Sequence, residues 1–343
     1  MPADLLRIAL RHRRISLELL TVHGTSRSQG PVEDALPESP LAVFLQPGGI
    51  RALHRLGVEV APLARQGCTI SKTLLLDARQ RPHAALDFSS ASPWLPMWIP
   101  LVELRAALAR SAESQEVTPT CAISAGDRPH SAANIPWRQR WCPGIFLRTL
   151  QGSLQNRQTQ LIWNGSSTYV GIAQTSPCSI LMYAVSKSPD PLALQRDRCL
   201  RALDEARPLL DRYAAQPSEA AVDQWFPLSF IGYRTCHDGQ VLFWGHETLR
   251  LHPLTGQDLS YWAIQAAWLT QAMIDRRLPL PELFRRLDQR NRWMFRQHLK
   301  TLYFFLPPTW RWRVIYQPYV QMLRASPWFG RHTARQIGLL ACP

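Results

Sequence analysis

The chain has 343 residues, enough to bury a large core and to build about two intertwined domains. Hydrophobic residues make up 46% of it and thirteen residues are tryptophan, which excludes a disordered protein. The net charge is +14, but no nucleic-acid-binding motif accompanies it, so we expect no nucleic-acid partner.

The cysteine spacing and the length of the apolar segments indicate the cellular compartment. The seven cysteines are scattered and form no Cys-x-x-Cys pair, which favours reduced thiols over a disulfide framework or a zinc site. No run of about 18 apolar residues predicts a membrane-spanning helix. The first residues carry early charges and do not resemble a secretory signal. We therefore expect a cytoplasmic protein.

The first third of the chain mixes helical and strand periodicities. Apolar residues recur at helical spacing in three segments and alternate in three others. We expect helices over residues 3–14, within Leu45–Val58 and over Leu101–Ala112, and strands over Ile15–Val22, Thr69–Leu76 and Pro82–Phe88.

The middle of the chain predicts a sheet and the remainder predicts helices. Gly144–Val185 is rich in β-branched and aromatic residues, and turn signals at Asn164-Gly165 and Ser176-Pro177 favour antiparallel strands. Further helices are expected over Leu194–Tyr213, Tyr261–Arg276 and Leu283–Lys300. The alternation of both element types predicts the α/β class.

Residues 241–260 form the most informative block. An apolar strand ends at Gly245, a loop carries His252-Pro253 and Gly256, and a helix follows from Tyr261. This layout resembles the second flavin-contacting block of the FAD-dependent aromatic hydroxylases of the para-hydroxybenzoate hydroxylase-like superfamily. It is nearest to the ubiquinone-biosynthesis hydroxylases, whose strand ends in Gly-Asp-Ala-Ala-His before a loop of the form His-Pro-x-x-Gly-Gln-Gly-x-Asn. The segments Leu45–Val58, Leu101–Ala112 and Ala125–Ser131 resemble further blocks, in the family's order.

The resemblance implies a three-part architecture. The parts are a nucleotide-binding-like three-layer domain truncated at its first strand, an antiparallel-sheet substrate domain and a C-terminal helical region. We expect the first part to comprise residues 1–66, 100–135 and 235–280, the second residues 67–99 and 136–234, and the third residues 281–343.

The flavin-binding groups that the resemblance implies are largely replaced. Pro2-Ala3-Asp4 stands where the family has its last phosphate-binding glycine turn, and Leu41 stands for an arginine near the phosphates. His246 replaces the carboxylate of Gly-Asp, and Asp258 and Ser260 replace the glycine and asparagine of the loop that faces the isoalloxazine ring. We therefore expect a degenerate site without a cofactor, with FAD as the alternative. The cofactor-type residues that remain are Arg105, Asp127, Gly245, Pro253 and Gly256.

These retained residues also have purely structural interpretations. Gly245 and Gly256 suit a tight strand-to-loop-to-helix path, Pro253 shapes a loop, Asp127 suits a helix cap and Arg105 suits a solvated helix face.

The candidate catalytic residues are His246, Glu247 and His252, because a His–Glu pair in an emptied flavin pocket could perform acid–base chemistry. The alternative is that they are ordinary polar loop residues. Their spacing does not place two histidines on one helical face, so we expect no metal site.

Together these patterns predict a degenerate flavin-monooxygenase-like protein. It would bind a lipophilic aromatic, quinone-like or polyketide-like small molecule in bacterial biosynthesis without flavin redox chemistry. It would act as a cofactor-independent cyclase or isomerase, or as an accessory subunit of a protein complex, and whether it is an enzyme stays open. The alternatives are a genuine FAD-dependent monooxygenase and a structural partner of an active hydroxylase. We expect an open, apolar cavity between the Gly144–Val185 sheet and the Leu251–Ser260 loop.

The tail mixes aromatic and basic residues. Residues 293–331 alternate Trp, Tyr and Phe with arginine, which suits an anionic membrane surface. The other interpretation is a helical subdomain with the aromatics in its core, and the two are compatible on opposite faces. We expect a cytoplasmic protein that associates peripherally with the inner face of the membrane.

Overall fold

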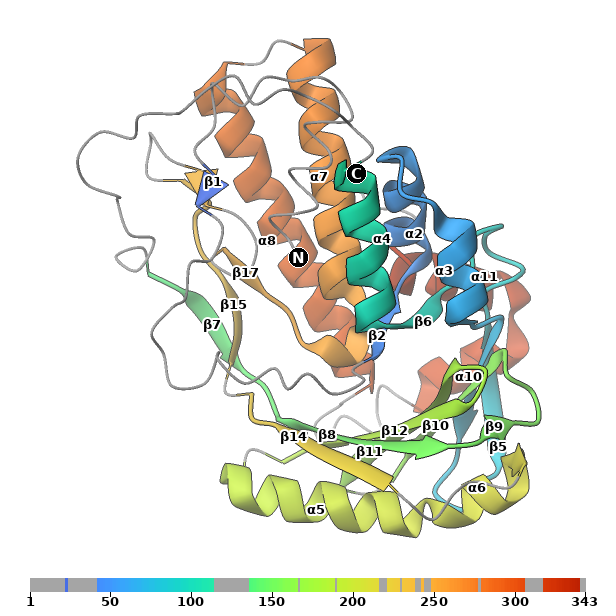
Figure 1. Cartoon of the computed structure of the whole chain (residues 1–343). Helices are drawn as coiled ribbons and strands as arrows, with labels where there is room; N and C mark the ends of the chain where they lie inside the picture. The colour runs from blue at the N-terminus through green and yellow to red at the C-terminus, as the bar shows by residue number, and fades with distance from the viewer. Residues whose placement is uncertain are drawn as a thin grey trace.

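The computed structural model describes residues 22–23, 42–113, 136–165, 167–188, 190–215, 221–228, 230–237, 242–243, 248–276, 279–305 and 317–339 (Figure 1). The predicted helix over residues 3–14, nearly all of the strand Ile15–Val22 and the block Ala125–Ser131 lie outside these residues. The described residues form an α/β fold, as the sequence predicts.

A seven-stranded sheet lies in the lower part of the molecule in Figure 1, above α5 (Leu192–Glu205) and α6 (Arg207–Tyr213). Its strands, in spatial order, are β14 (Ala221–Phe226), β8 (Ile145–Gln151), β12 (Ser179–Ser186), β11 (Thr168–Ser176), β10 (Thr159–Asn164), β4 (Lys72–Leu76) and β5 (Pro82–Asp87). The predicted antiparallel pairing within Gly144–Val185 is confirmed, and β4 and β5 also pair in antiparallel orientation. The parallel pairing of β10 with β4, which joins these two groups, was not predicted.

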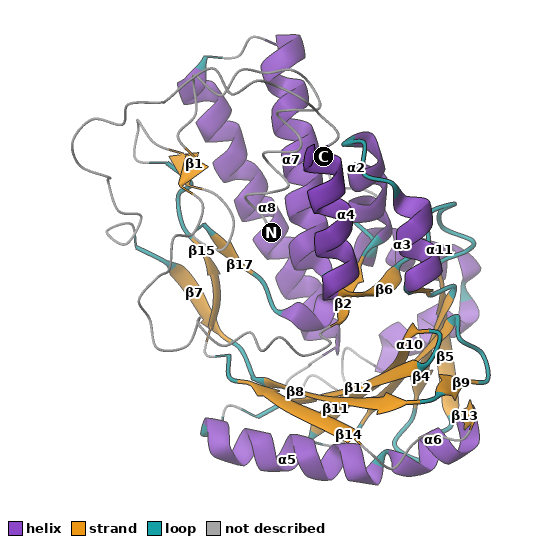
Figure 2. Ribbon diagram, in the orientation of Figure 1, coloured by secondary structure: helices purple, strands orange, loops and turns teal. Residues whose placement is uncertain are grey.

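The sheet separates two hydrophobic cores, because successive side chains of a strand point to opposite faces. On β12, Ile180, Met182 and Ala184 face one core, whereas Tyr183 and Val185 face the other. The first core is covered by α5 and α6, which lie along the outer face of the sheet (Figure 2). A single helix over Leu194–Tyr213 was predicted, but it breaks at Ala206, two residues before Pro208, whose ring disfavours a continuous helix.

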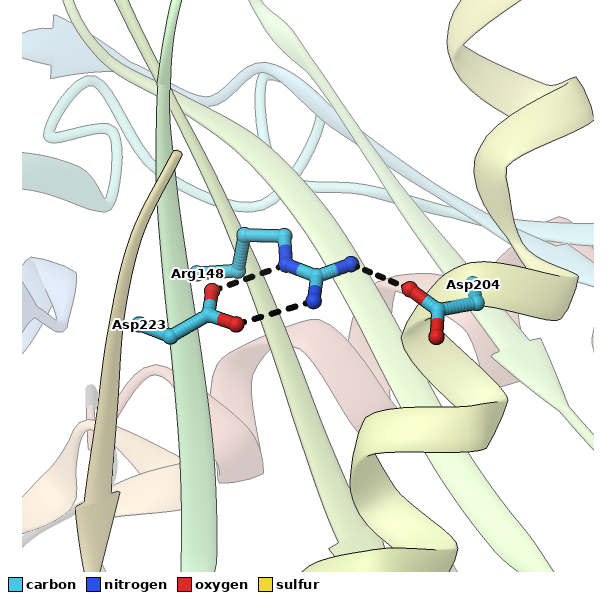
Figure 3. A network of polar contacts seen from close by, with 3 residues as sticks. All are labelled: Arg148, Asp204 and Asp223. Atoms are coloured by element: carbon cyan, nitrogen blue, oxygen red, sulfur yellow. Dashed lines mark hydrogen bonds and ion pairs between the residues drawn. The ribbon is translucent and has the colours of Figure 1, made fainter. Parts of the chain in front are cut away.

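An ion-pair network attaches α5 to the sheet. Arg148 on β8 forms a bidentate pair with Asp223 on the neighbouring β14, with N–O distances of 2.8 and 2.9 Å, and its third nitrogen lies 2.6 Å from Asp204 on α5 (Figure 3). The hydrogen bond to Asp223 is the main reason that the Arg148 pKa is raised. The network therefore links two strands and a helix through one guanidinium.

The other face of the sheet carries most of the remaining helices and three small sheets (Figure 1). The helices are α2 (Pro47–Arg55), α3 (Val60–Gln66), α4 (Leu101–Glu113), α7 (Gln257–Arg276) and α8 (Leu280–Phe305). The strands form the sheets β2-β6-β3 (Ala42–Leu45, Met97–Pro100, Cys68–Thr69), β17-β15-β7 (Leu249–Arg250, Phe230–Tyr233, Arg138–Trp141) and β1-β16 (Val22–His23, Leu242–Phe243). β9 (Ser153–Leu154) pairs with β13 (Ala214–Ala215).

The end of the chain forms two helices, α10 (Gln317–Ala325) and α11 (Pro327–Ile337), which both contact β5. The backbone N–H of Gly48 donates to the carbonyl of Gly338 over 2.8 Å and joins this region to the start of α2. No helix among the described residues is long and apolar enough to cross a membrane.

Candidate functional site

The described part of the most informative block has the predicted order of strand, loop and helix, but the helix begins at Gln257 rather than Tyr261, which places Asp258 and Ser260 in its first turn. After β17, the 3-10 helix η4 (Pro253–Thr255) leads through Gly256 into α7. Gly256 has φ +60°, a left-handed conformation that glycine adopts without strain. Gly245, His246, Glu247 and Asp127 lie outside the described residues, so their roles stay predictions.

His252 is fully buried at the base of this loop. Its ring Nε2 donates to the carbonyl oxygen of Pro143, 3.0 Å away. Burial lowers the pKa of His252 to about 4. The structure thus places this candidate acid–base residue where it anchors the loop to the chain segment entering β8, and its catalytic role stays a prediction.

A second buried histidine, His298 on α8, completes the anchor. Its Nε2 accepts the backbone N–H of His252 over 2.9 Å, and its Nδ1 donates to the side-chain oxygen of Gln257 over 3.1 Å. Burial holds the pKa of His298 well below its usual range, and a proton on His252 would lower it further by repulsion. Sequence reasoning missed His298, although Asn291, His298 and Thr301 recur at helical spacing on the buried side of α8.

The opposite side of the loop is covered by β2 and the start of α2. A Cβ added to Gly256 would lie 2.3 Å from Cδ1 of Phe44, and one added to Gly49 would lie 2.5 Å from Cα of Ser260. The backbone N–H of Gln46 donates to Ser260 Oγ over 2.8 Å, and its side-chain amide donates to the carbonyl of Thr255 over 2.7 Å. The two segments are therefore in direct van der Waals and hydrogen-bond contact.

Four aromatic rings continue from this contact to the large sheet. Phe44 lies 4.9 Å from Trp98, Trp98 lies 5.9 Å from Tyr183, and Tyr183 stacks on Tyr169 at 6.2 Å, centroid to centroid. We name these residues the aromatic chain. The expectation of an open apolar cavity between sheet and loop was therefore wrong along this path, because bulky side chains from the sheet and from β2 and β6 fill it.

Tyr183 lies across the backbone of the neighbouring strand. A Cβ on Gly171 would come within 2.0 Å of Tyr183 Cζ, so only glycine admits this ring position. The hydroxyl accepts a hydrogen bond from the buried amide of Gln160. Burial raises the pKa of Tyr183 well above its ordinary value, so the phenol stays neutral.

The two remaining candidate residues are exposed. Arg105 lies on the solvent side of α4, a helix that packs against α3 and β6, and Pro253 is exposed at the start of η4. The described residues contain no group of three His, Cys, Asp or Glu side chains that could hold a metal ion.

A cleft opens elsewhere, between α2, α3 and the loop that precedes β6. Its volume is about 720 Å³. The imidazole of His54 lies 5.2 Å from the ring of Trp94 on its wall. The apolar lining comprises Ile50, Val60, Ala61, Pro62, Ala64, Pro93, Trp94, Leu95 and Met97, and the polar lining comprises His54, Glu59, Arg65 and Thr69.

Comparisons with known proteins identify the fold. No family model and no curated protein matches the chain. Among solved structures, p-nitrophenol 4-monooxygenase PnpA from Pseudomonas putida DLL-E4 superposes with a TM-score of 0.65 at 11% identity, over 98% of this chain and 96% of PnpA. Pseudomonas aeruginosa PqsL in complex with 2-aminobenzoylacetate gives 0.63 at 12% identity, over 99% and 96%.

A third neighbour was solved with a flavin. Klebsiella pneumoniae HpxO, complexed with FAD and uric acid, gives a TM-score of 0.62 at 14% identity, over 90% of each chain. At this level of identity the likeness concerns the fold alone. The chain has the fold of the FAD-dependent aromatic hydroxylase-type monooxygenases.

Proposed function

We propose that this chain is a flavin-monooxygenase-fold protein without flavin redox chemistry. It binds a lipophilic aromatic, quinone-like or polyketide-like compound as an accessory protein in biosynthesis. The observation that carries this proposal is the direct contact of the Pro253–Ser260 segment, which comprises η4, Gly256 and the first turn of α7, with β2 and α2.

The side of this segment that faces β2 and α2 does not fit a flavin ring. The resemblance implies that the segment faces the isoalloxazine, but Phe44 and Gln46 cover it on that side. A ring placed there would displace Phe44 and leave the buried N–H of Gln46 without its partner, at a cost of about 1–3 kcal/mol for the unsatisfied group alone. Asp258 adds a carboxylate, which opposes the negative charge of a reduced flavin.

The cleft between α2 and α3 is the better site for a lipophilic compound. Its volume of about 720 Å³ lies within the range of small-molecule sites, and its lining combines an apolar majority with a few polar groups. The partly exposed ring of Trp94 supplies a surface that planar aromatic molecules favour.

Two titrations of the full-length protein test the proposal. Flavin fluorescence should show weak or no FAD binding, and a dissociation constant at or below about 1 μM would contradict it. A quinone probe, menadione, should bind, and Ala64→Trp in the cleft should abolish that binding. The matched control is Ala221→Trp on the exposed edge of β14, which should leave binding unchanged.

Failure of both ligands to bind would overturn the small-molecule proposal and support the structural-partner hypothesis, which the filled aromatic chain favours. A genuine FAD monooxygenase is the second candidate, because HpxO has this fold and was solved with FAD. A purified protein that is yellow and shows a flavin absorption band would establish that candidate in place of the first.

A further inference from the structure

The two C-terminal helices are each attached to the body by one face. Val320 and Leu323 on α10, and Ala334 and Ile337 on α11, are buried against the core. The described tail residues are helical and pack on the sheet, as the helical-subdomain interpretation expects, but only Tyr319 and Phe329 among their aromatic rings are partly buried, whereas Trp328 is exposed. The other face of each helix is left to solvent.

The solvent face of these helices is basic and carries large apolar side chains. Trp328 is 65% exposed and Met322 is 46% exposed, both unusual for residues of their size. Arg324, Arg331 and Arg335 on the same two helices are exposed as well, and residues 317–339 contain no aspartate or glutamate. We name Met322, Arg324, Trp328, Arg331, His332 and Arg335 the C-terminal basic face.

The members of this face on α11 lie along one side of the helix. Trp328, Arg331, His332 and Arg335 follow the i, i+3, i+4, i+7 spacing, which places them on one side of a helix. The Trp328 ring stacks on His332 with an interplanar angle of 11° at 5.4 Å. Thr333, Ala334 and Ile337 lie on the opposite, buried side, so the stripe is held in place by its own helix.

We propose that the C-terminal basic face binds the surface of an anionic phospholipid membrane. Guanidinium groups bind lipid phosphates, and an exposed indole ring partitions into the interface between headgroups and acyl chains. A membrane is favoured over an acidic protein or a nucleic acid because an exposed Trp and Met accompany the charges without any acidic residue. This proposal does not depend on the proposed function.

The position of this face suits delivery of a lipophilic compound. The Gly48–Gly338 hydrogen bond joins the end of α11 to the start of α2, and α2 supplies one wall of the cleft. If α11 binds the membrane, α2 and the cleft that it lines are therefore held next to the membrane-bound helix.

Flotation of the full-length protein with vesicles tests the proposal. At low salt it should float with vesicles of phosphatidylcholine and phosphatidylglycerol in equal amounts, and not with phosphatidylcholine alone. Arg331→Glu/Arg335→Glu should lower the partition coefficient at least about tenfold, because each basic residue near an anionic membrane surface strengthens binding and each glutamate is repelled by it. Trp328→Ala should lower it at both low and high salt, since burial of the ring does not depend on charge.

The matched control is Arg196→Glu/Arg201→Glu on α5, which changes the net charge equally at exposed positions of another helix. Thermal unfolding should be similar for all variants, because every substituted side chain is exposed. The proposal is overturned if the unmodified protein does not float at low salt. It is equally overturned if the α5 variant loses as much binding as the α11 variant.

Discussion

Phe44 lies directly over the α-carbon of Gly256, so that a Cβ at residue 256 would meet Phe44 Cδ1 at 2.3 Å. The loop that the resemblance assigns to the flavin ring is therefore in contact with a side chain of its own protein. Gly256 serves two purposes at once, because its φ of +60° disfavours other residues and its missing Cβ admits the phenyl ring. The glycine of the motif has a structural explanation that requires no cofactor.

Gly256→Ala tests this relationship. We expect a loss of about 2–4 kcal/mol in the free energy of unfolding, from the left-handed backbone and the overpacked ring together. In the double variant Phe44→Ala/Gly256→Ala the steric part should disappear, so the two losses should be less than additive. Urea unfolding of the four proteins of this cycle measures the coupling, and strict additivity would show that Phe44 does not press on residue 256.

Local signals in the sequence predicted the elements of this site well. Gly256 before an apolar segment predicted the turn into α7, and the turn signals at Asn164-Gly165 and Ser176-Pro177 predicted the hairpins. These features depend on residues close together in the chain, where backbone conformation and hydrogen-bond periodicity decide the outcome.

Contacts between distant segments were not predicted. Gln46 and Ser260, 214 residues apart, form a hydrogen bond that the periodicity of the sequence does not predict. The parallel pairing of β10 with β4 likewise depends on tertiary packing. The expected cavity was wrong along the aromatic chain for the same reason, since Trp98 and Tyr183 come together only when β6 meets the large sheet.

Arg148→Lys should weaken the attachment of α5 to the sheet. A lysine ammonium cannot form the bidentate pair with Asp223 and reach Asp204 at the same time, so we expect a loss of about 1 kcal/mol. Asp204→Asn should cost less than about 0.5 kcal/mol, because the Asp204 side chain is 63% exposed. Urea midpoints give both values, and an equal loss in the two variants would contradict the central role of the Arg148–Asp223 pair.

Tyr183→Phe should destabilise the interior of the sheet although it keeps the ring. The phenylalanine leaves the buried amide of Gln160 without its acceptor, which costs about 1–3 kcal/mol in the free energy of unfolding. The control Tyr213→Phe on α6 should change it by less than about 0.5 kcal/mol, as is usual near the surface. If Tyr183→Phe is as stable as the unmodified protein, the hydroxyl does not hold Gln160.

The buried histidines make the fold sensitive to acid. Between pH 6.5 and about 4, the unfolded chain binds a proton on His252 and the folded chain does not. Acidification through this window therefore favours unfolding. The lowered pKa corresponds to about 3 kcal/mol in the free energy of unfolding, which is fully present above pH 6.5 and is lost as the pH falls to about 4. His298, whose pKa is lowered as well, adds to the loss in the same direction.

His252→Gln tests this dependence, because glutamine keeps an N–H donor for the Pro143 carbonyl and does not titrate. The free energy of unfolding, measured in urea at a series of pH values, should fall less steeply with acidification than in the unmodified protein. The comparison concerns the slope, so a uniform loss of stability from imperfect packing does not affect it. An unchanged slope in His252→Gln would show that His252 does not stay neutral in the folded protein, and the assignment of this residue as a neutral structural anchor would fail.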